Sequence, residues 1–271
     1  MLLSVQSVAK PWGVVDLPAP FQSGERKPIG EIWFEPPPAV PDVLIKYIFT
    51  SEKLSVQVHP SDDDTEAAGL GRCGKEECWL ITSAEPGASL AIGFRETIEA
   101  EKVRAAALDG SIENLLAWHP VVAGDFFYIP AGTVHTIGAG VSLIEVQQTS
   151  DITYRLYDYG RRRELHLDEA LAVAQLAPYD TKFRKQLAPT GSQLLVDGPH
   201  FELYYIDGSS GTDDTVYSGQ PALILPLGGS VTVGQQSVSP GQCGLLNGDE
   251  LRFGDGDKFL LARSLSGSNS Q

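Results

Sequence analysis

Cysteine, positive charge and long apolar runs are all scarce in this 271-residue sequence. Its three cysteines are sparse and odd in number, so a framework of disulfide bonds is not expected. No stretch approaches the roughly 18 apolar residues that a membrane-spanning helix requires. The first residues also lack the basic start and apolar core of a secretory signal peptide. These absences predict a cytoplasmic protein that does not enter a membrane.

Acidic residues outnumber basic ones, with 35 Asp and Glu against 20 Lys and Arg, and the formal net charge is -15. Proteins that bind nucleic acids or anionic membranes usually carry clustered positive charge, so neither is expected as a partner. A small anionic substrate is not excluded, but local cations must then build its site. The few basic residues near catalytic candidates are therefore informative.

The amino-acid pattern is typical of short strands joined by tight turns, because 28 glycines and 18 prolines are scattered among short apolar runs. Residues 97–118 change to a helical period and predict two helices broken at Asp109-Gly110. The segment Leu167–Leu176 predicts a short amphipathic helix. The acidic stretch Pro60–Glu66 is interpreted as a linker.

Candidate metal ligands are spread over three predicted strands. In Leu54–Pro60 the side chains alternate, so Gln57 and His59 share one face while the other face is apolar. A turn delivers His135 onto a following strand, and Glu77 opens an apolar one. Two imidazoles, a carboxylate and an amide oxygen suit a zinc ion. A single strand histidine is more often structural than a ligand, so these residues alone leave both interpretations open.

Charged residues also lie within the apolar run Leu143–Tyr159. By alternation Glu145 and Gln147 share one face, and Asp151 shares a face with Arg155. Charges inside an apolar strand are costly unless they are paired or face a wet cavity. The run therefore predicts either polar groups that line a cavity or an Asp151–Arg155 ion pair on the surface of an edge strand.

A faint internal repeat aligns residues 123–135 with residues 240–252, since both read as turn, strand, turn and strand. The position of His135 in the first copy is taken by Arg252 in the second. The repeat predicts two related β-barrels, of which only the first has metal ligands. Two unrelated antiparallel meanders would give a similar pattern.

Four segments stand in the order Leu54–Pro60 (LSVQVHP), Gly74–Trp79 (GKEECW), Ile129–His135 (IPAGTVH) and Glu145–Tyr159. In this order they resemble the motifs of type I mannose-6-phosphate isomerases of the cupin superfamily. The resemblance extends from Lys10-Pro-Trp-Gly13 to about Asp168, and the chain is similar to the compact bacterial form of the family.

The resemblance implies an all-β fold with a helical insertion, in which a cupin jelly-roll barrel is joined to a second, smaller cupin-like β domain. Residues 1–186 are expected to form the metal-binding barrel, with the helical insertion at 97–118. Residues 187–271 are expected to form the smaller domain, without metal ligands.

The resemblance also implies a metal site. In the family one zinc ion is held by the glutamine and histidine of the first motif, the glutamate of the second and the histidine of the third. Carried over, these ligands are Gln57, His59, Glu77 and His135, with one Zn²⁺ per chain. The sequence departs from the family at Glu76, where a small polar residue is usual. Strand alternation lets only one of the two glutamates point inward, and the spacing favours Glu77.

The activity that the resemblance implies belongs to carbohydrate metabolism: an aldose–ketose isomerase that interconverts mannose 6-phosphate and fructose 6-phosphate through a cis-enediol. The metal would polarise the C1 and C2 oxygens of the sugar, and cations would stabilise the developing negative charge. The catalytic residues implied are Lys46, Lys75, Glu145, Asp151 and Arg155. The proton carrier stays open among Asp151, Glu145, a lysine and a metal-bound hydroxide.

A phosphorylated sugar needs a cation for its phosphate, and the basic cluster nearest to these motifs is Arg161-Arg162-Arg163. The family often has a basic residue at the position of Arg161, so the resemblance implies Arg161 as the substrate-binding residue. The alternative interpretation is a solubilising basic turn before the helix predicted at Leu167.

Two other functions stay open. His59, Glu77 and His135 are also the two-histidine, one-carboxylate set that holds ferrous iron in oxygenases. A regulatory cupin that binds a sugar phosphate without turnover would keep the same residues. Gln57 as a fourth ligand and the cluster of cations favour the isomerase. No oligomeric state is indicated.

Overall fold

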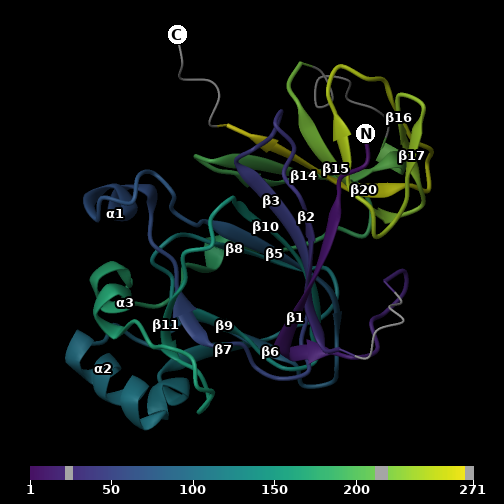
Figure 1. Cartoon of the computed structure of the whole chain (residues 1–271). Helices are drawn as coiled ribbons and strands as arrows, with labels where there is room; N and C mark the ends of the chain where they lie inside the picture. Colours follow the sequence, from purple (N-terminus) through teal and green to yellow (C-terminus); the bar gives the residue numbers. More distant parts are fainter. Residues whose placement is uncertain (22–26, 211–218, 266–271) are drawn as a thin grey trace.

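The computed structural model describes residues 1–21, 27–210 and 219–265, in which antiparallel strands form four sheets (Figure 1). The first sheet has seven strands, in the order β1-β2-β3-β10-β5-β8-β12. Their bounds are Val5–Val14 (β1), Ile29–Phe34 (β2), Val43–Phe49 (β3), Val141–Gln148 (β10), Glu77–Ala84 (β5), Asp125–Ile129 (β8) and Arg184–Gln186 (β12). The second sheet has five strands, in the order β11-β4-β9-β6-β7. Their bounds are Tyr154–Tyr157 (β11), Val56–Val58 (β4), His135–Ile137 (β9), Ser89–Phe94 (β6) and Leu116–Pro120 (β7).

These two sheets lie opposite each other and form a barrel (Figure 1). Apolar side chains of both sheets pack between them, including Trp79 and Ile81 of β5 with Leu90 and Ile92 of β6. The apolar face of β4 points the other way, where it packs under the helices. The predicted alternation of this strand is thus confirmed, and its polar face is left for the interior of the barrel.

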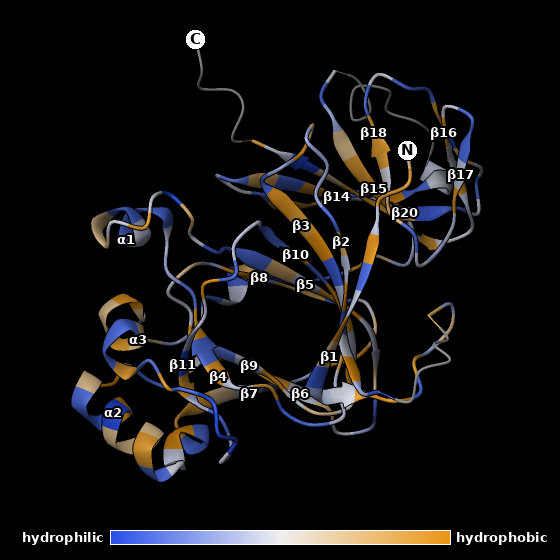
Figure 2. Cartoon of the chain, in the orientation of Figure 1, coloured by the Kyte–Doolittle hydropathy of each residue, from blue (hydrophilic) through white to orange (hydrophobic). Residues whose placement is uncertain are grey.

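Three helices lie on the side of the barrel formed by β11 and β4 (Figure 1). They are α1 (Asp62–Ala67), α2 (Ala100–Asp109) and α3 (Leu167–Val173). Buried residues of α2 and α3 pack against Val56, Val58 and Leu156. Figure 2 shows α2 and α3 with mixed polar and apolar residues, whereas β3 is largely apolar. None of the described helices is long and apolar enough to cross a membrane.

Two predictions about helices were wrong. The acidic stretch predicted as a linker forms α1, because Ser61 and Asp64 make a reciprocal capping box: each side chain accepts a hydrogen bond from the other's backbone N–H. The predicted break at Asp109-Gly110 is confirmed, with Gly110 at a φ of 83°. The second predicted helix is only a 3₁₀ turn, η1 (Ser111–Asn114), because the chain then joins β7 at the edge of the second sheet.

The chain after β12 forms two further sheets. A 3₁₀ turn, η2 (Thr181–Phe183), precedes β12, and a second, η3 (Gly208–Ser210), follows β14. One has the order β13-β14-β20-β15-β18 and the other β17-β16-β19. Their bounds are Gln193–Asp197 (β13), Phe201–Asp207 (β14), Lys258–Ser264 (β20), Ala222–Gly228 (β15), Gly244–Leu246 (β18), Gln236–Val238 (β17), Val231–Val233 (β16) and Leu251–Arg252 (β19). One apolar cluster joins β3 to β14, β15 and β20, so the seven-stranded sheet and the β13-β14-β20-β15-β18 sheet share a core.

The predicted domain boundary falls between the last strand of the first sheet and β13, and the division into two domains stays a prediction. Residues 211–218 and 266–271 of the second part lie outside the described residues. Arg252, which aligns with His135 in the repeat, is exposed and donates to Gly234 O at 3.0 Å. That the second part has no metal ligands stays a prediction.

Candidate active site

The predicted metal ligands come from both sheets of the barrel. Gln57 in β4 pairs directly with His135, the first residue of β9, within the second sheet. His59 follows β4, and Glu77 opens β5 in the opposite sheet. Closure of the barrel therefore brings the carboxylate against the two imidazoles.

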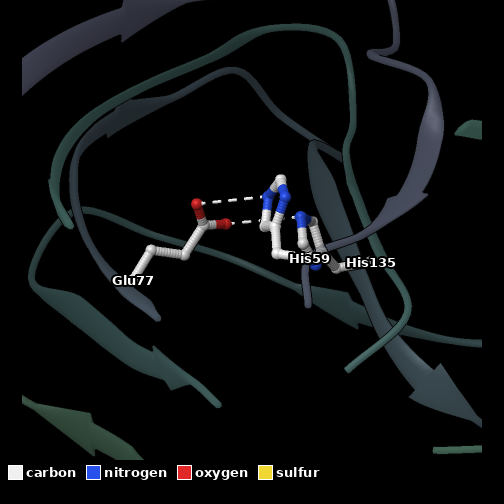
Figure 3. A group of neighbouring side chains, drawn as sticks. All are labelled: His59, Glu77 and His135. Carbon is white, nitrogen blue, oxygen red and sulfur yellow. Dashed lines mark ion pairs between the residues drawn. The ribbon is translucent and has the colours of Figure 1, made fainter. Parts of the chain in front are cut away.

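The Glu77 carboxylate faces both imidazoles (Figure 3). Its Oε2 is 3.4 Å from His59 Nε2, and its Oε1 is 3.3 Å from His135 Nε2. The ligand atoms of the three residues lie within 4.8 Å of one another, and no other such group occurs in the described part of the chain. All three residues are buried, with at most 2% of their surface exposed.

Backbone carbonyls determine which imidazole nitrogens face the centre of the group. His59 Nδ1 is 2.9 Å from Ile152 O, and His135 Nδ1 is 2.9 Å from Thr133 O. A carbonyl only accepts, so each Nδ1 carries the proton and each Nε2 presents a lone pair. Burial lowers the pKa of both imidazoles, that of His135 to about 3. At neutral pH both are uncharged, which is the form that binds a metal.

The Glu77 carboxylate supplies negative charge to the group. Burial alone would raise its pKa, but the Lys75 ammonium together with His59 and His135 outweighs burial and holds the pKa well below its usual range. Oε2 accepts a hydrogen bond from Lys75 Nζ, whereas Oε1 is buried without a hydrogen-bond donor among the described residues. An ionised oxygen buried beside an unprotonated nitrogen is costly unless a cation binds both. The residues present therefore fit a divalent metal ion.

The Gln57 side chain is able to join this group. Its Nε2 is 3.2 Å from His135 Nε2, and its Oε1 accepts a hydrogen bond from Ser55 Oγ at 3.1 Å. A half-turn of the amide would exchange the two atoms, and the Ser55 hydroxyl can then accept from the amide NH₂. Ser55 therefore supports Gln57 in either orientation.

A cavity of about 490 Å³ lies beside the metal-ligand group, a volume that suits a small organic molecule. Gln57 is part of its wall. All five residues expected to be catalytic also line it, namely Lys46, Lys75, Glu145, Asp151 and Arg155. The fold thus brings the predicted metal ligands and the predicted catalytic residues to one place.

Lys46 and Glu145 form a buried ion pair in the wall of this cavity. Lys46 Nζ is 3.1 Å from Glu145 Oε1 and also donates to Gln147 Oε1 at 2.5 Å. The second carboxylate oxygen of Glu145 accepts from Trp79 Nε1 at 3.0 Å. Both oxygens are therefore already engaged, and the net charge of the pair is zero.

Asp151 and Arg155 both line the cavity, and no ion pair joins them among the described residues. Asp151 is exposed. Arg155 donates from Nη1 to Glu164 O at 3.3 Å, while its buried Nε has no partner within the described part of the chain. The alternative of an Asp151–Arg155 surface pair is therefore not what the structure has.

Arg161, the predicted phosphate ligand, is not part of the cavity wall, whereas its neighbour Arg163 is. The Arg161 guanidinium instead contacts Glu52 Oε2 at 3.2 Å and Asp158 Oδ1 at 3.1 Å. The family resemblance favoured Arg161 over Arg163, and the sequence does not show the side-chain directions within the turn after Gly160.

Sequence reasoning also missed the cavity wall made by β1 and β2. Lys10 and Glu31 form an ion pair of 3.1 Å there, and Trp33 Nε1 donates to Glu31 Oε2 at 2.7 Å. The Trp33 ring lies 4.7 Å from Lys46 Nζ. Glu31 and Trp33 are two residues apart in a predicted strand, and this spacing could have indicated that both side chains face the cavity.

Two opposed antiparallel sheets that hold two histidines and a carboxylate between them define a metal-binding protein of the cupin type. No protein-family model matches the chain. Over 221 residues it is 37% identical to the mannose-6-phosphate isomerase of Streptococcus mutans, covering 77% of this chain and 67% of that protein. The chain belongs to the mannose-6-phosphate isomerase family, as its motifs predicted.

Solved structures share the fold. The mannose 6-phosphate isomerase from Bacillus subtilis matches 97% of this chain and 98% of its own, with a TM-score of 0.77 and 22% identity. A zinc-bound mannose 6-phosphate isomerase matches the same shares, with a TM-score of 0.73 and 13% identity. The predicted all-β cupin architecture is thereby confirmed.

Proposed function

We propose that the protein interconverts mannose 6-phosphate and fructose 6-phosphate. The observation that carries this proposal is the buried group of His59, Glu77 and His135 beside a cavity lined by cations and by one carboxylate that has no partner among the described residues. Proton transfer between adjacent carbons of a sugar needs a base and positive charge near the oxygens. The name of the Streptococcus mutans relative supports the choice of reaction.

The metal that we propose is zinc, held by Gln57, His59, Glu77 and His135. Two imidazoles and oxygen donors suit zinc, and one of the structures that share the fold is zinc-bound. When bound, a divalent ion supplies positive charge that favours an enediolate over a neutral sugar.

The cations of the chain would act on the same negative charge. Lys75 is buried, and although burial alone would lower its pKa, Glu77 and Glu145 raise it, so its ammonium stays charged. Arg155 is the cross-strand partner of Gln57, which places its backbone beside the metal-ligand group. Both residues line the cavity. In this site they would hold the sugar oxygens while the proton moves between C1 and C2.

Asp151 is our candidate for the proton carrier. It is the cavity carboxylate without a hydrogen-bond or ion-pair partner among the described residues, whereas Glu145 is held by Lys46 and Trp79. An unpaired carboxylate has a lone pair available to take a proton from one carbon and return it to the next.

A coupled assay tests the proposed function. The protein is expressed, its metal content is measured, and the formation of fructose 6-phosphate from mannose 6-phosphate is followed before and after treatment with a chelator. We expect about one zinc per chain, turnover, and loss of turnover with the metal that zinc restores. Zinc-loaded protein without turnover would refute the isomerase and leave a regulatory role. Iron-dependent oxygen consumption would favour an oxygenase.

Arg155→Lys is expected to lower turnover on mannose 6-phosphate about a hundredfold. Lysine keeps the charge but loses the planar fork that presents several donors at once. The loss of one well-placed donor to developing charge typically costs this much. Steady-state kinetics of the metal-loaded variant measure the effect.

The matched control is Arg184→Lys, since Arg184 pairs with Asp125 outside the cavity wall. The control should keep its turnover within about twofold, as expected of a half-exposed ion pair. Equal, small effects in the two variants would return Arg155 to a structural role.

A further inference from the structure

One buried carboxylate organises the arginines that follow β11. Asp158 is 2% exposed and accepts hydrogen bonds from Arg163 Nε at 2.7 Å and Arg163 Nη2 at 2.6 Å. The same carboxylate accepts from Arg161 Nη1 at 3.1 Å. A bidentate carboxylate–guanidinium contact fixes both position and direction of the guanidinium. Asp158 therefore sets where Arg163 points.

The two arginines held by Asp158 differ in what their remaining donors reach. Arg161 Nη2 donates to Lys53 O at 2.6 Å and to Glu52 Oε2 at 3.2 Å, so the terminal nitrogens of this guanidinium already donate to protein atoms. Arg163 lies in the cavity wall, and its Nη1 donates to no described residue. The arginine with a donor to spare is thus the one that faces the cavity.

Backbone hydrogen bonds place this segment along the edge of the second sheet. His166 N donates to Arg155 O at 2.8 Å, and Arg155 N donates to His166 Nδ1 at 3.2 Å. The segment after Arg163 therefore runs beside β11, and β4 with Gln57 lies on the other side of β11. Neighbouring strands are about 4.8 Å apart, so this segment is roughly 10 Å from β4. That is the scale of a six-carbon sugar with a phosphate on its last carbon.

Arg155 and Arg163 both line the cavity, and no carboxylate of the described residues contacts both of them. Arg155 Nε is buried without a hydrogen-bond partner among the described residues. Burial, and then the charge of Arg163, lowers the pKa of Arg155. Asp158 forms ion pairs with both Arg161 and Arg163, so its single negative charge does not neutralise both guanidinium groups. An anion between Arg155 and Arg163 would satisfy the free donors and relieve the repulsion.

We propose that Arg163 binds the phosphate of the substrate beside Arg155, that Asp158 is the positioning residue for Arg163, and that Arg161 supports the turn. This proposal deepens the proposed function and rests on it. It gives the sugar a direction: the carbons that exchange the proton lie toward Gln57, and the phosphate lies toward the segment after β11.

The test compares Arg163→Ala with Arg161→Ala, two neighbouring arginines on the same carboxylate. In Arg163→Ala we expect the KM for mannose 6-phosphate to rise about tenfold to a hundredfold with kcat within about threefold, as for the loss of a charged hydrogen bond. In Arg161→Ala we expect KM to change less than about threefold, since Arg161 lies outside the cavity wall and its guanidinium donates to Lys53 O, Glu52 and Asp158. An unchanged KM in Arg163→Ala, or an equal rise in Arg161→Ala, would overturn the proposal.

Binding of inorganic phosphate to the zinc-loaded protein, measured by calorimetry, separates this proposal from the proposed function because it needs no turnover. Arg163→Ala should weaken phosphate binding more than tenfold relative to Arg161→Ala. Equal affinities in the two variants would refute the anion site even if the wild type is an isomerase. A difference without isomerase activity would support the anion site and refute the reaction.

Asp158→Asn and Asp158→Glu test the positioning role. The amide keeps the size of the side chain but loses the bidentate acceptor, so we expect KM to rise while kcat is kept. The glutamate should recover part of the affinity. A fall in kcat with unchanged KM, or a loss of thermal stability without any change in KM, would contradict this role. If Asp158→Asn does not fold, Arg163→Ala still decides the proposal.

Discussion

His135→Ala is expected to remove most of the bound metal and to abolish turnover. His135 presents its Nε2 to Glu77 Oε1 at 3.3 Å, and no other imidazole reaches that oxygen in the described structure. Even partners that only orient a ligand typically change metal affinity about 10- to 100-fold, so the loss of a ligand should exceed that range. Metal content after dialysis and the rate of the coupled assay measure the two effects.

His119→Ala is the matched control for this experiment. His119 is a half-buried histidine in β7 that lies outside the metal-ligand group and the cavity wall. The control should keep its metal and its rate. A His135→Ala protein that retains stoichiometric zinc and a near-normal rate would show that the metal site has been assigned to the wrong residues.

Asp151→Asn is expected to lower kcat by about 10² to 10⁴, with metal content unchanged. An amide has nearly the size of a carboxylate but cannot take up the proton, and general acid–base catalysis typically contributes this factor. Asp151 contacts none of the metal ligands by a hydrogen bond in the described structure, so zinc should remain bound. Turnover, metal analysis and exchange of the C2 proton of the sugar with solvent give three independent readouts.

Glu145→Gln distinguishes Glu145 from Asp151 as the proton carrier. Glu145 holds Lys46 and Trp79, so its loss should lower the free energy of unfolding by about 3 to 5 kcal/mol, because the Lys46 charge is left buried and unpaired. Proton exchange at C2 should persist in the folded protein. If exchange disappears in Glu145→Gln and persists in Asp151→Asn, the roles of the two residues are reversed.

Much of the site could be predicted from local sequence because strand alternation is a short-range property. Once Leu54–Pro60 is taken as a strand, Gln57 and His59 must share the face opposite Val56 and Val58, and the structure confirms this. The same reasoning placed Glu145 and Gln147 on one face, and both contact Lys46. The family resemblance of the motifs then implied that Gln57, His59, Glu77 and His135 share one metal.

Local capping chemistry was also in the sequence but was overlooked. Ser61 and Asp64 stand three residues apart before a turn, which is the spacing of a capping box. The run of acids was instead interpreted as a linker, because its high charge was taken as the sign of a linker and the capping hydrogen bonds that begin a helix were not considered. The result is the error at α1.

The sequence by itself determined the family, the barrel strands and the faces that their side chains share, because these depend on periodicity and on motif order. Only the tertiary structure decided which arginine of the run 161–163 enters the cavity and that Asp151 and Arg155 are not paired. Side-chain directions in a turn are set by whichever partners the fold brings within reach, near or far along the chain. Glu52, about a hundred residues away, draws Arg161 outward, and the buried Asp158 aims Arg163 inward.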